Sequence, residues 1–235
     1  MAAEGCDLVI GARSADDLAT LAGEIAAAHG VNVEPLAIDM GDLASVDGFA
    51  DAVIAAGGAD ILVNNGGGPP PSGALGVAPE VWRQQFEAMM LGVIRLTDRL
   101  VPGMRERRWG RVLTVASSGV VQPIPTLAIS NALRAGVVLF MKTLAGEVAA
   151  DDVTVNVVAP GRIWTERTDQ IDAANADRQG LSQDEIRKRS IATIPVGRYG
   201  KVEEFAAVVC FLAGAPAAFV TGHVMRVDGG MIRSV

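Results

Sequence analysis

The 235-residue chain is poor in several residue types, and each shortage excludes a class of protein. Its two histidines, His29 and His223, and its two cysteines, Cys6 and Cys210, have no metal-ligand spacing. A metal site and a Ser/His/Asp triad are therefore not expected. Both cysteines stand in apolar runs, and we expect them to be small buried residues rather than disulfide partners.

Positive charge and long apolar runs are also scarce. The formal net charge is −7, only three residues are lysines, and the one basic cluster is the arginine-rich stretch 105–111. Nucleic-acid binding is therefore not expected. Apolar runs end well short of the roughly 18 residues that span a bilayer, and the first residues lack the basic start of a secretory signal. We expect a soluble, cytoplasmic protein without membrane partners.

What the chain does contain is the alternation of strands and helices. Half of its residues are apolar and a fifth are charged, which suits a domain with a sizeable core. Alternating elements give parallel strands joined by crossover helices, so we predict one α/β domain with a Rossmann-like, doubly wound sheet. The expected strands are 7–12, 33–40, 61–65, 111–117, 153–160 and 223–227, and the expected helices start at Ser14 and Asp42 and cover 80–107 and 130–149.

Four motifs at strand ends and in later loops have the order and spacing of one family. They are Asn64-Asn65-Gly66-Gly67, Pro160-Gly161, IPVGRYGKVEEFAAVVCFLAG at 194–214 and TGHVMRVDGG at 221–230. With them the whole chain resembles the short-chain dehydrogenase/reductase family, most closely its β-ketoacyl-ACP-reductase-like branch. The resemblance implies a dinucleotide in the crevice at the carboxyl ends of the strands.

The resemblance also implies which residues bind the cofactor. Glycines after a strand let the backbone approach a ligand, although they could instead form only a turn before three prolines. Arg13 follows the first strand without the acid that would bind the ribose of NAD, and an arginine there suits the 2′-phosphate of NADP. Asp39 could instead be a turn or cap residue. The expected cofactor-binding residues for NADP are Arg13, Asp39, Met40, Asn65, Gly66, Gly67, Pro160, Gly161, Ile163 and Thr165.

The catalytic positions depart from the family. Ser117 matches the family's serine, but Ser130 and Arg134 replace its tyrosine and lysine. Met89 replaces its water-holding asparagine, and the only tyrosine of the chain, Tyr199, belongs to another motif. A serine hydroxyl is a weaker acid than a phenol, and an arginine can steady an oxyanion but cannot relay a proton. Alternatively, Ser130 is only a helix N-cap and Arg134 only a solvated or interface arginine.

The start of the chain departs from the family as well. The family's first strand and glycine-rich phosphate loop lie about 24 residues before the strand 7–12. This chain begins six residues before that strand, and MAAEG suggests the last turn of a helix. We therefore expect an N-terminally incomplete domain over 1–235, with a slot in its sheet and weakened phosphate binding. A start assigned too far downstream and a naturally degenerate relative are the two explanations.

These patterns predict an NADP-preferring oxidoreductase of the short-chain type, similar to 3-oxoacyl-ACP reductases, that acts on a small carbonyl or alcohol through Ser117, Ser130 and Arg134. Two alternatives stay open. One is a non-catalytic relative that binds a ligand or pairs with another subunit, and the other is a redox-free lyase or dehydratase that uses Ser117 and Arg134 around an oxyanion.

Two further segments match the family in position. The polar stretch 162–189 corresponds to its mobile substrate lid, or is a solvated face. Helices 80–107 and 130–149 correspond to those that form the family's dimer and tetramer contacts. The resemblance thus implies a homodimer or homotetramer.

Overall fold

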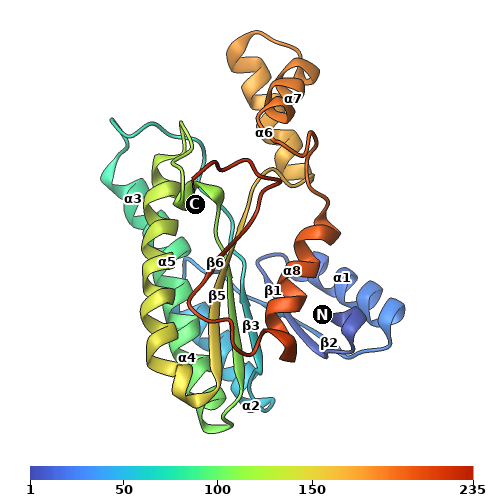
Figure 1. The fold of residues 1–235 in the computed structure, drawn as a ribbon. Helices are drawn as coiled ribbons and strands as arrows, with labels where there is room; N and C mark the ends of the chain where they lie inside the picture. The colour runs from blue at the N-terminus through green and yellow to red at the C-terminus, as the bar shows by residue number, and fades with distance from the viewer. Residues whose placement is uncertain (235) are drawn as a thin grey trace.

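The structure is a computed structural model that describes residues 1–234, and all their side chains except that of residue 167 (Figure 1). Its strands are β1 (Leu8–Ala12), β2 (Val33–Ala37), β3 (Ile61–Asn64), β4 (Gly110–Val115), β5 (Val153–Pro160) and β6 (Val224–Val227). Its α-helices are α1 (Ala15–His29), α2 (Leu43–Ala55), α3 (Pro79–Phe86), α4 (Gly92–Glu106), α5 (Ala128–Val148), α6 (Glu166–Gln179), α7 (Gln183–Ala192) and α8 (Val202–Ala213). Each predicted strand and helix is present.

Local sequence signals set the ends of the early helices. Ser14 caps α1 because its hydroxyl oxygen accepts a hydrogen bond from the Asp17 N–H, and Gly30 ends that helix in the left-handed conformation, with φ of 69°. Asp42 caps α2 by accepting from the Ala44 N–H at 2.9 Å. The predicted helix 80–107 is divided, because the π-helical segment η2 (Glu87–Leu91) lies between α3 and α4.

All strand pairs are parallel, but they form two sheets. One sheet has the order β3-β4-β5-β6, and the other contains only β1 and β2. Strands β4 and β5 are buried on both faces, as near-continuous apolar strands between helices should be. In contrast, Val9 of β1 and Val63 of β3 are each 39% exposed.

The handedness of the crossovers places β1 between β2 and β3. Helix α1 packs on β1 and β2, whereas α2 packs against α4 in the other helix layer. A right-handed crossover moves the chain to one side along the sheet when its helix covers one face, and to the other side when its helix covers the opposite face. The chain therefore moves from β1 to β2 in one direction and then back past β1 to β3 (Figure 1). No hydrogen-bonded pairing joins β1 to β3 within residues 1–234. The two sheets are therefore not joined by hydrogen bonds between these strands, and the expected incompleteness of the domain stays a prediction.

Two of the apolar clusters formed by the described residues pack on the larger sheet, one on each face. On one face, α2, α4 and α5 pack residues such as Leu96 and Met141 onto Val112 and Val155. On the other face, α8 packs Leu212 onto the sheet. This confirms the predicted doubly wound α/β fold. Among residues 1–234, no helix is long and apolar enough to cross a bilayer.

Helices α6 and α7 form a hairpin that projects beyond the carboxyl ends of the strands (Figure 1). They pack mainly against each other. Their position above the strand ends is the one at which a lid would cover a ligand.

Candidate active site

The predicted site residues follow three neighbouring strands. Gly66 and Gly67 come after β3, Ser117 after β4, and Gly161 after β5. Because these strands are parallel, their carboxyl ends lie at one edge of the sheet. Residues that are far apart in the sequence thus share one surface below the α6–α7 hairpin (Figure 1).

Arg134 joins two of these strand ends from the second turn of α5. Its Nη1 donates to the Val115 carbonyl at 2.9 Å, and its Nη2 donates to the Gly67 carbonyl at 3.1 Å and the Gly66 carbonyl at 3.3 Å. Burial lowers the pKa of the Arg134 guanidinium, and no described carboxylate lies beside it. The alternative of a solvated arginine is therefore wrong, because Arg134 holds the glycine loop against the end of β4.

Ser117 has extended backbone and caps the short 3₁₀ helix η3 (Ser118–Val120). Its Oγ accepts from the Gly119 N–H at 3.1 Å, which leaves the hydroxyl hydrogen free to donate elsewhere. The loop that follows is fastened to α5 by Asn131, whose Nδ2 donates to the Ile124 carbonyl at 2.9 Å. A Cβ at Gly119 would lie 2.5 Å from Asn131 Oδ1, so this contact requires glycine. The sequence analysis did not find the role of Asn131.

Ser130 is buried in the first turn of α5. The alternative interpretation of Ser130 as the N-cap is wrong, because the helix begins at Ala128 and Leu127 occupies the cap position. Ser130 precedes Arg134 by one helical turn and so lies on the same face of α5. Its hydroxyl makes no hydrogen bond to another described residue and is available to a ligand or to water.

Met89 lies in the π-helical segment η2. It is buried and packs with Ile129 and Leu133 of α5. Single π-helical turns occur often at functional sites, and Met89 lies within this one. Met89 also lines a cavity of about 20 Å³ together with Arg134 and the glycine loop. Helical periodicity alone could not reveal the π turn.

The residues expected at the adenosine end have different environments. Arg13 follows β1, is exposed, and has no hydrogen-bond or ion-pair partner among the described residues. Asp39 Oδ1 accepts from the Gly41 N–H at 2.9 Å, so its carboxylate already stabilises a turn. Met40 packs against the core. Of the two charged residues, Arg13 and Asp39, only Arg13 has a charged group without a partner among the described residues.

The other residues expected to bind the cofactor fall into an open and a packed group. Asn65 is exposed, and a Cβ built on Gly66 or Gly67 would meet nothing within 4 Å, so this loop offers open surface. After Pro160, the last residue of β5, a Cβ on Gly161 would lie 2.7 Å from Asp228 Cα, so here glycine allows close packing against the end of β6.

Ile163 and Thr165 form the start of the hairpin. Thr165 caps α6 by accepting from the Thr168 N–H at 3.3 Å, and the Ile163 carbonyl accepts from Thr168 Oγ1 at 2.6 Å. Ile163 also lines a cavity of about 210 Å³, which is formed by the loop after β5, the segment after α7 and the end of β6. Both residues therefore lie at the junction between strand and hairpin.

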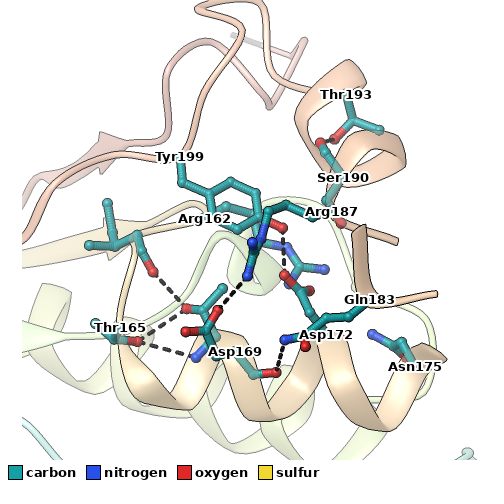
Figure 2. A network of polar contacts seen from close by, with 12 residues as sticks. Arg162, Thr165, Asp169, Asp172, Asn175, Gln183, Arg187, Ser190, Thr193 and Tyr199 are labelled. Carbon is teal, nitrogen blue, oxygen red and sulfur yellow. Dashed lines mark hydrogen bonds and ion pairs between the residues drawn. The ribbon is translucent and has the colours of Figure 1, made fainter. Parts of the chain in front are cut away.

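A buried polar network fixes this hairpin to the body of the domain (Figure 2). Asp172 of α6 is fully buried, and its carboxylate accepts from Tyr199 Oη at 2.8 Å and Arg162 Nη1 at 3.2 Å. Burial raises the pKa of Tyr199. The only tyrosine thus serves the hairpin, and a solvated face is the wrong interpretation at Asp172.

The sequence contains one signal for this network. Thr168, Asp172 and Ala176 are spaced by four residues and are all buried, so they form one face of α6. The signal was missed because two of the three side chains are polar.

A second set of contacts closes the hairpin on itself. Arg187 Nη2 lies 2.9 Å from Asp169 Oδ1 (Figure 2). The Arg187 guanidinium also stacks over the ring of Trp164, 4.4 Å from its centroid. Cation–π contacts of this kind stabilise partly exposed sites modestly. The segment 162–189 is therefore a folded unit with its own polar interior.

Comparison with known proteins identifies the class that this fold and site define. A family model described as enoyl-(acyl carrier protein) reductase matches residues 1–232. The 3-oxoacyl-(acyl-carrier-protein) reductase FabG of Escherichia coli is 35% identical over 205 residues, which cover 86% of this chain and 79% of FabG.

Two solved structures share the fold. The L-sorbose reductase from Gluconobacter frateurii, complexed with NADPH and L-sorbose, has a TM-score of 0.94 at 33% identity and covers 100% of this chain and 90% of its own. The actinorhodin polyketide ketoreductase with NADPH has a TM-score of 0.91 at 32% identity. The alignment covers 97% of this chain and 88% of the ketoreductase chain.

The chain belongs to the short-chain dehydrogenase/reductase family. This confirms the predicted family and its ketoacyl-reductase-like branch. These relatives are reductases, in agreement with the predicted class of oxidoreductase, and both solved relatives contain NADPH, in agreement with the predicted cofactor. The comparisons leave the roles of Ser130 and Arg134 as predictions.

Proposed function

We propose that this chain is an NADP-preferring oxidoreductase of the short-chain type that acts on a small carbonyl or alcohol. The observation that supports this most is that Arg134 donates hydrogen bonds to backbone carbonyls at the ends of β3 and β4, which fixes a positive charge beside these strand ends. The relatives add that ketoacyl reduction is the chemistry found on this fold at about one third identity.

The described residues fit NADP at the 2′-phosphate end and at the nicotinamide end, but not at the pyrophosphate. Arg13 has a free guanidinium suited to bidentate binding of a 2′-phosphate, and the Gly66–Gly67 loop offers open backbone. Gly161, Ile163 and Thr165 would lie at the nicotinamide end. The pyrophosphate is the exception, because the described residues place no glycine-rich helix start between β1 and β3. When bound, NADPH supplies a hydride.

The chain's own residues would then act on the substrate oxygen. Ser117 has a free hydroxyl hydrogen to donate, and Arg134 stabilises negative charge that develops on this oxygen. Arg134 cannot exchange a proton, and Ser130 is a weak acid with a short reach. Protonation therefore depends on water, and we expect carbonyl reduction to be slower than with a tyrosine acid by about 10²- to 10⁴-fold.

A redox-free lyase or dehydratase is the second candidate. It is favoured by the fixed charge of Arg134, which has no carboxylate partner among the described residues and is only partly offset by backbone carbonyls. Such a site can stabilise an oxyanion without any cofactor. The two candidates differ in whether NADPH is consumed.

We further propose that the protein is a cytoplasmic homodimer or homotetramer that associates through α4 and α5. Leu139 is 69% exposed in the middle of α5, so contact with a second copy would remove apolar surface from water.

The test compares the 235-residue chain with an extended form that carries a strand, a glycine-rich turn and a helix of the family's kind ahead of Met1. We expect the extended form to bind NADPH at least about 100-fold more tightly, since two hydrogen bonds to a charged phosphate contribute about 3 kcal/mol or more. Fluorescence titration measures this binding, and NADPH oxidation with ketones and β-ketoacyl thioesters measures the activity. Equally tight binding by the 235-residue chain would contradict the expected role of a glycine-rich phosphate loop.

Dehydration is followed in parallel with β-hydroxyacyl thioesters in the absence of NADPH. Turnover there, together with no NADPH consumption by the extended form on the whole ketone and thioester panel, would favour the second candidate. An Arg134→Met variant serves as the control, because both activities should depend on this charge.

A further inference from the structure

A buried amide beside the site lacks half of its hydrogen bonds. Asn64, the last residue of β3, is 4% exposed, and its Nδ2 lies 3.2 Å from Thr97 Oγ1 and 3.4 Å from Thr114 Oγ1. Its Oδ1 is buried and accepts no hydrogen bond from any described residue. A buried acceptor without a hydrogen bond has lost its contact with water and gained nothing in return, so such groups usually have a partner.

The cavity of about 20 Å³ described above lies next to this amide. Asn64 and Arg134 line it together with Thr114, the Gly66–Gly67 loop and apolar side chains that include Met89. Arg134 is the only charged side chain among its lining residues. The Nε–H of Arg134 is not used in its three contacts with backbone carbonyls, so a donor is left over. A single water needs roughly 10–15 Å³ of such space and two or more polar partners.

The chemistry of the lining selects the occupant. An apolar group would leave Asn64 Oδ1 unsatisfied, and an anion cannot donate a hydrogen bond to that oxygen. A cation would lie against the guanidinium of Arg134. A neutral group that both donates and accepts, of the size of one water molecule, satisfies all three conditions.

We propose that this cavity binds one water molecule, which donates a hydrogen bond to Asn64 Oδ1 and accepts one from Arg134. Asn64 is then a positioning residue. Through the water it orients Arg134, and Arg134 in turn holds the Gly66–Gly67 loop. The inference does not rest on the reductase assignment, because its tests read hydration and stability rather than turnover.

The first test is a crystal structure of the 235-residue chain at a resolution that shows ordered water. We expect one water within hydrogen-bond distance of both Asn64 Oδ1 and an Arg134 nitrogen. An empty cavity, or a water that contacts Asn64 but not Arg134, would overturn the proposal.

The second test measures how the stability of an Asn64→Asp variant depends on pH. This dependence shows whether residue 64 interacts with Arg134. If the new carboxylate shares the water with Arg134, its folded pKa stays at or below the unfolded value, and the stability relative to the parent chain is constant from pH 4.5 to 8. If it is isolated in the core, its folded pKa is raised, and the folding equilibrium falls by up to tenfold for each pH unit above about 4.

Asn156→Asp is the matched control. Asn156 is 1% exposed on β5, with Oδ1 accepting from the His223 N–H and Nδ2 donating to the Val220 carbonyl. No guanidinium is bonded to it, so this variant should lose stability as the pH rises. The same loss in Asn64→Asp would overturn the proposal. When Arg134→Met is added to Asn64→Asp, the stability of the double variant should again fall as the pH rises. A double variant whose stability does not fall would contradict the link between Asn64 and Arg134.

Discussion

The two parts of the sheet differ in how fully their strands are paired and covered. Strands β3 to β6 form a continuous parallel sheet, and β4 and β5 are buried on both faces. Strands β1 and β2 pair only with each other, and each residue of these two strands is at least partly exposed. The first part holds Ser117 and Arg134, and the second holds Arg13. The part that holds the proposed catalytic residues is therefore more completely paired and buried than the part that holds the proposed 2′-phosphate contact.

The residues that we propose for catalysis and those that we propose for cofactor binding thus depend on different parts of the chain. The hydrogen bonds from Arg134 to the Val115 and Gly67 carbonyls involve only α5 and the ends of β3 and β4. Binding of the cofactor phosphates would need the boundary between β1 and β3, where hydrogen bonding is interrupted. Four variants test this comparison, and they are given from the largest expected effect to the smallest.

The largest effect should come from restoring the acid in the well-built part. In the extended form, Ser130→Tyr with Arg134→Lys and Met89→Asn should raise carbonyl reduction by about 10²- to 10⁴-fold, because general acid catalysis contributes that much. The measurement is NADPH oxidation against ketones and β-ketoacyl thioesters. A triple variant that binds NADPH and reduces nothing on the panel would favour a binding role or the redox-free reaction.

The next effect concerns the cofactor end. In the extended form, Arg13→Ala should remove most of the preference for NADPH over NADH, by about tenfold or more, because a charge-assisted contact contributes about 1.5–3 kcal/mol. Titration with both cofactors measures the preference. Arg83→Ala is a control, because Arg83 is an exposed arginine paired with Glu80 and far from β1 in the sequence. Equal affinities of the unmodified extended form for the two cofactors would contradict the role of Arg13.

The hairpin gives a smaller effect, on stability. Tyr199→Phe leaves Asp172 buried without one of its two donors, so the free energy of unfolding should fall by about 1–3 kcal/mol. Amide hydrogen exchange should increase in α6 and α7 but not in α5. Equal protection of α6 in the variant and the parent chain would mean that the hydroxyl does not anchor the hairpin.

The smallest effect is at the surface. Arg198 pairs with Glu204 at 2.8 Å and lowers the pKa of Glu204 from 4.5 to about 2. Because this pKa is depressed in the folded state, the stabilisation is present above pH 4.5 and is lost as the pH falls toward 2. Glu204→Gln should therefore be less stable than the parent at pH 7, and the two should converge near pH 2. Denaturant titrations at several pH values test this, and a difference independent of pH would contradict it.

Local patterns in the sequence were sufficient for the elements and for several site positions. Ser14 and Asp42 cap helices as their residue types suggest, and the strand-end motifs place Ser117 and Gly66 at one edge of the sheet. The contacts of Arg134 could not be predicted, because they go to backbone carbonyls that any sequence provides. The burial of Asp172 could not be predicted from local patterns either. Its hydrogen-bond partners, Arg162 and Tyr199, lie 10 and 27 residues away in the sequence.

The close approach of α4 to the loop after β2 has a mechanical consequence. A side chain at Gly92 would place its Cβ 2.3 Å from the Met40 carbonyl oxygen, so helix and loop touch backbone to backbone. The part of the molecule that holds β1 and β2 is thereby tied to the substrate end through a helix rather than through the sheet. A larger residue at position 92 would therefore have to push α4 and this loop apart, and with them the two parts of the molecule.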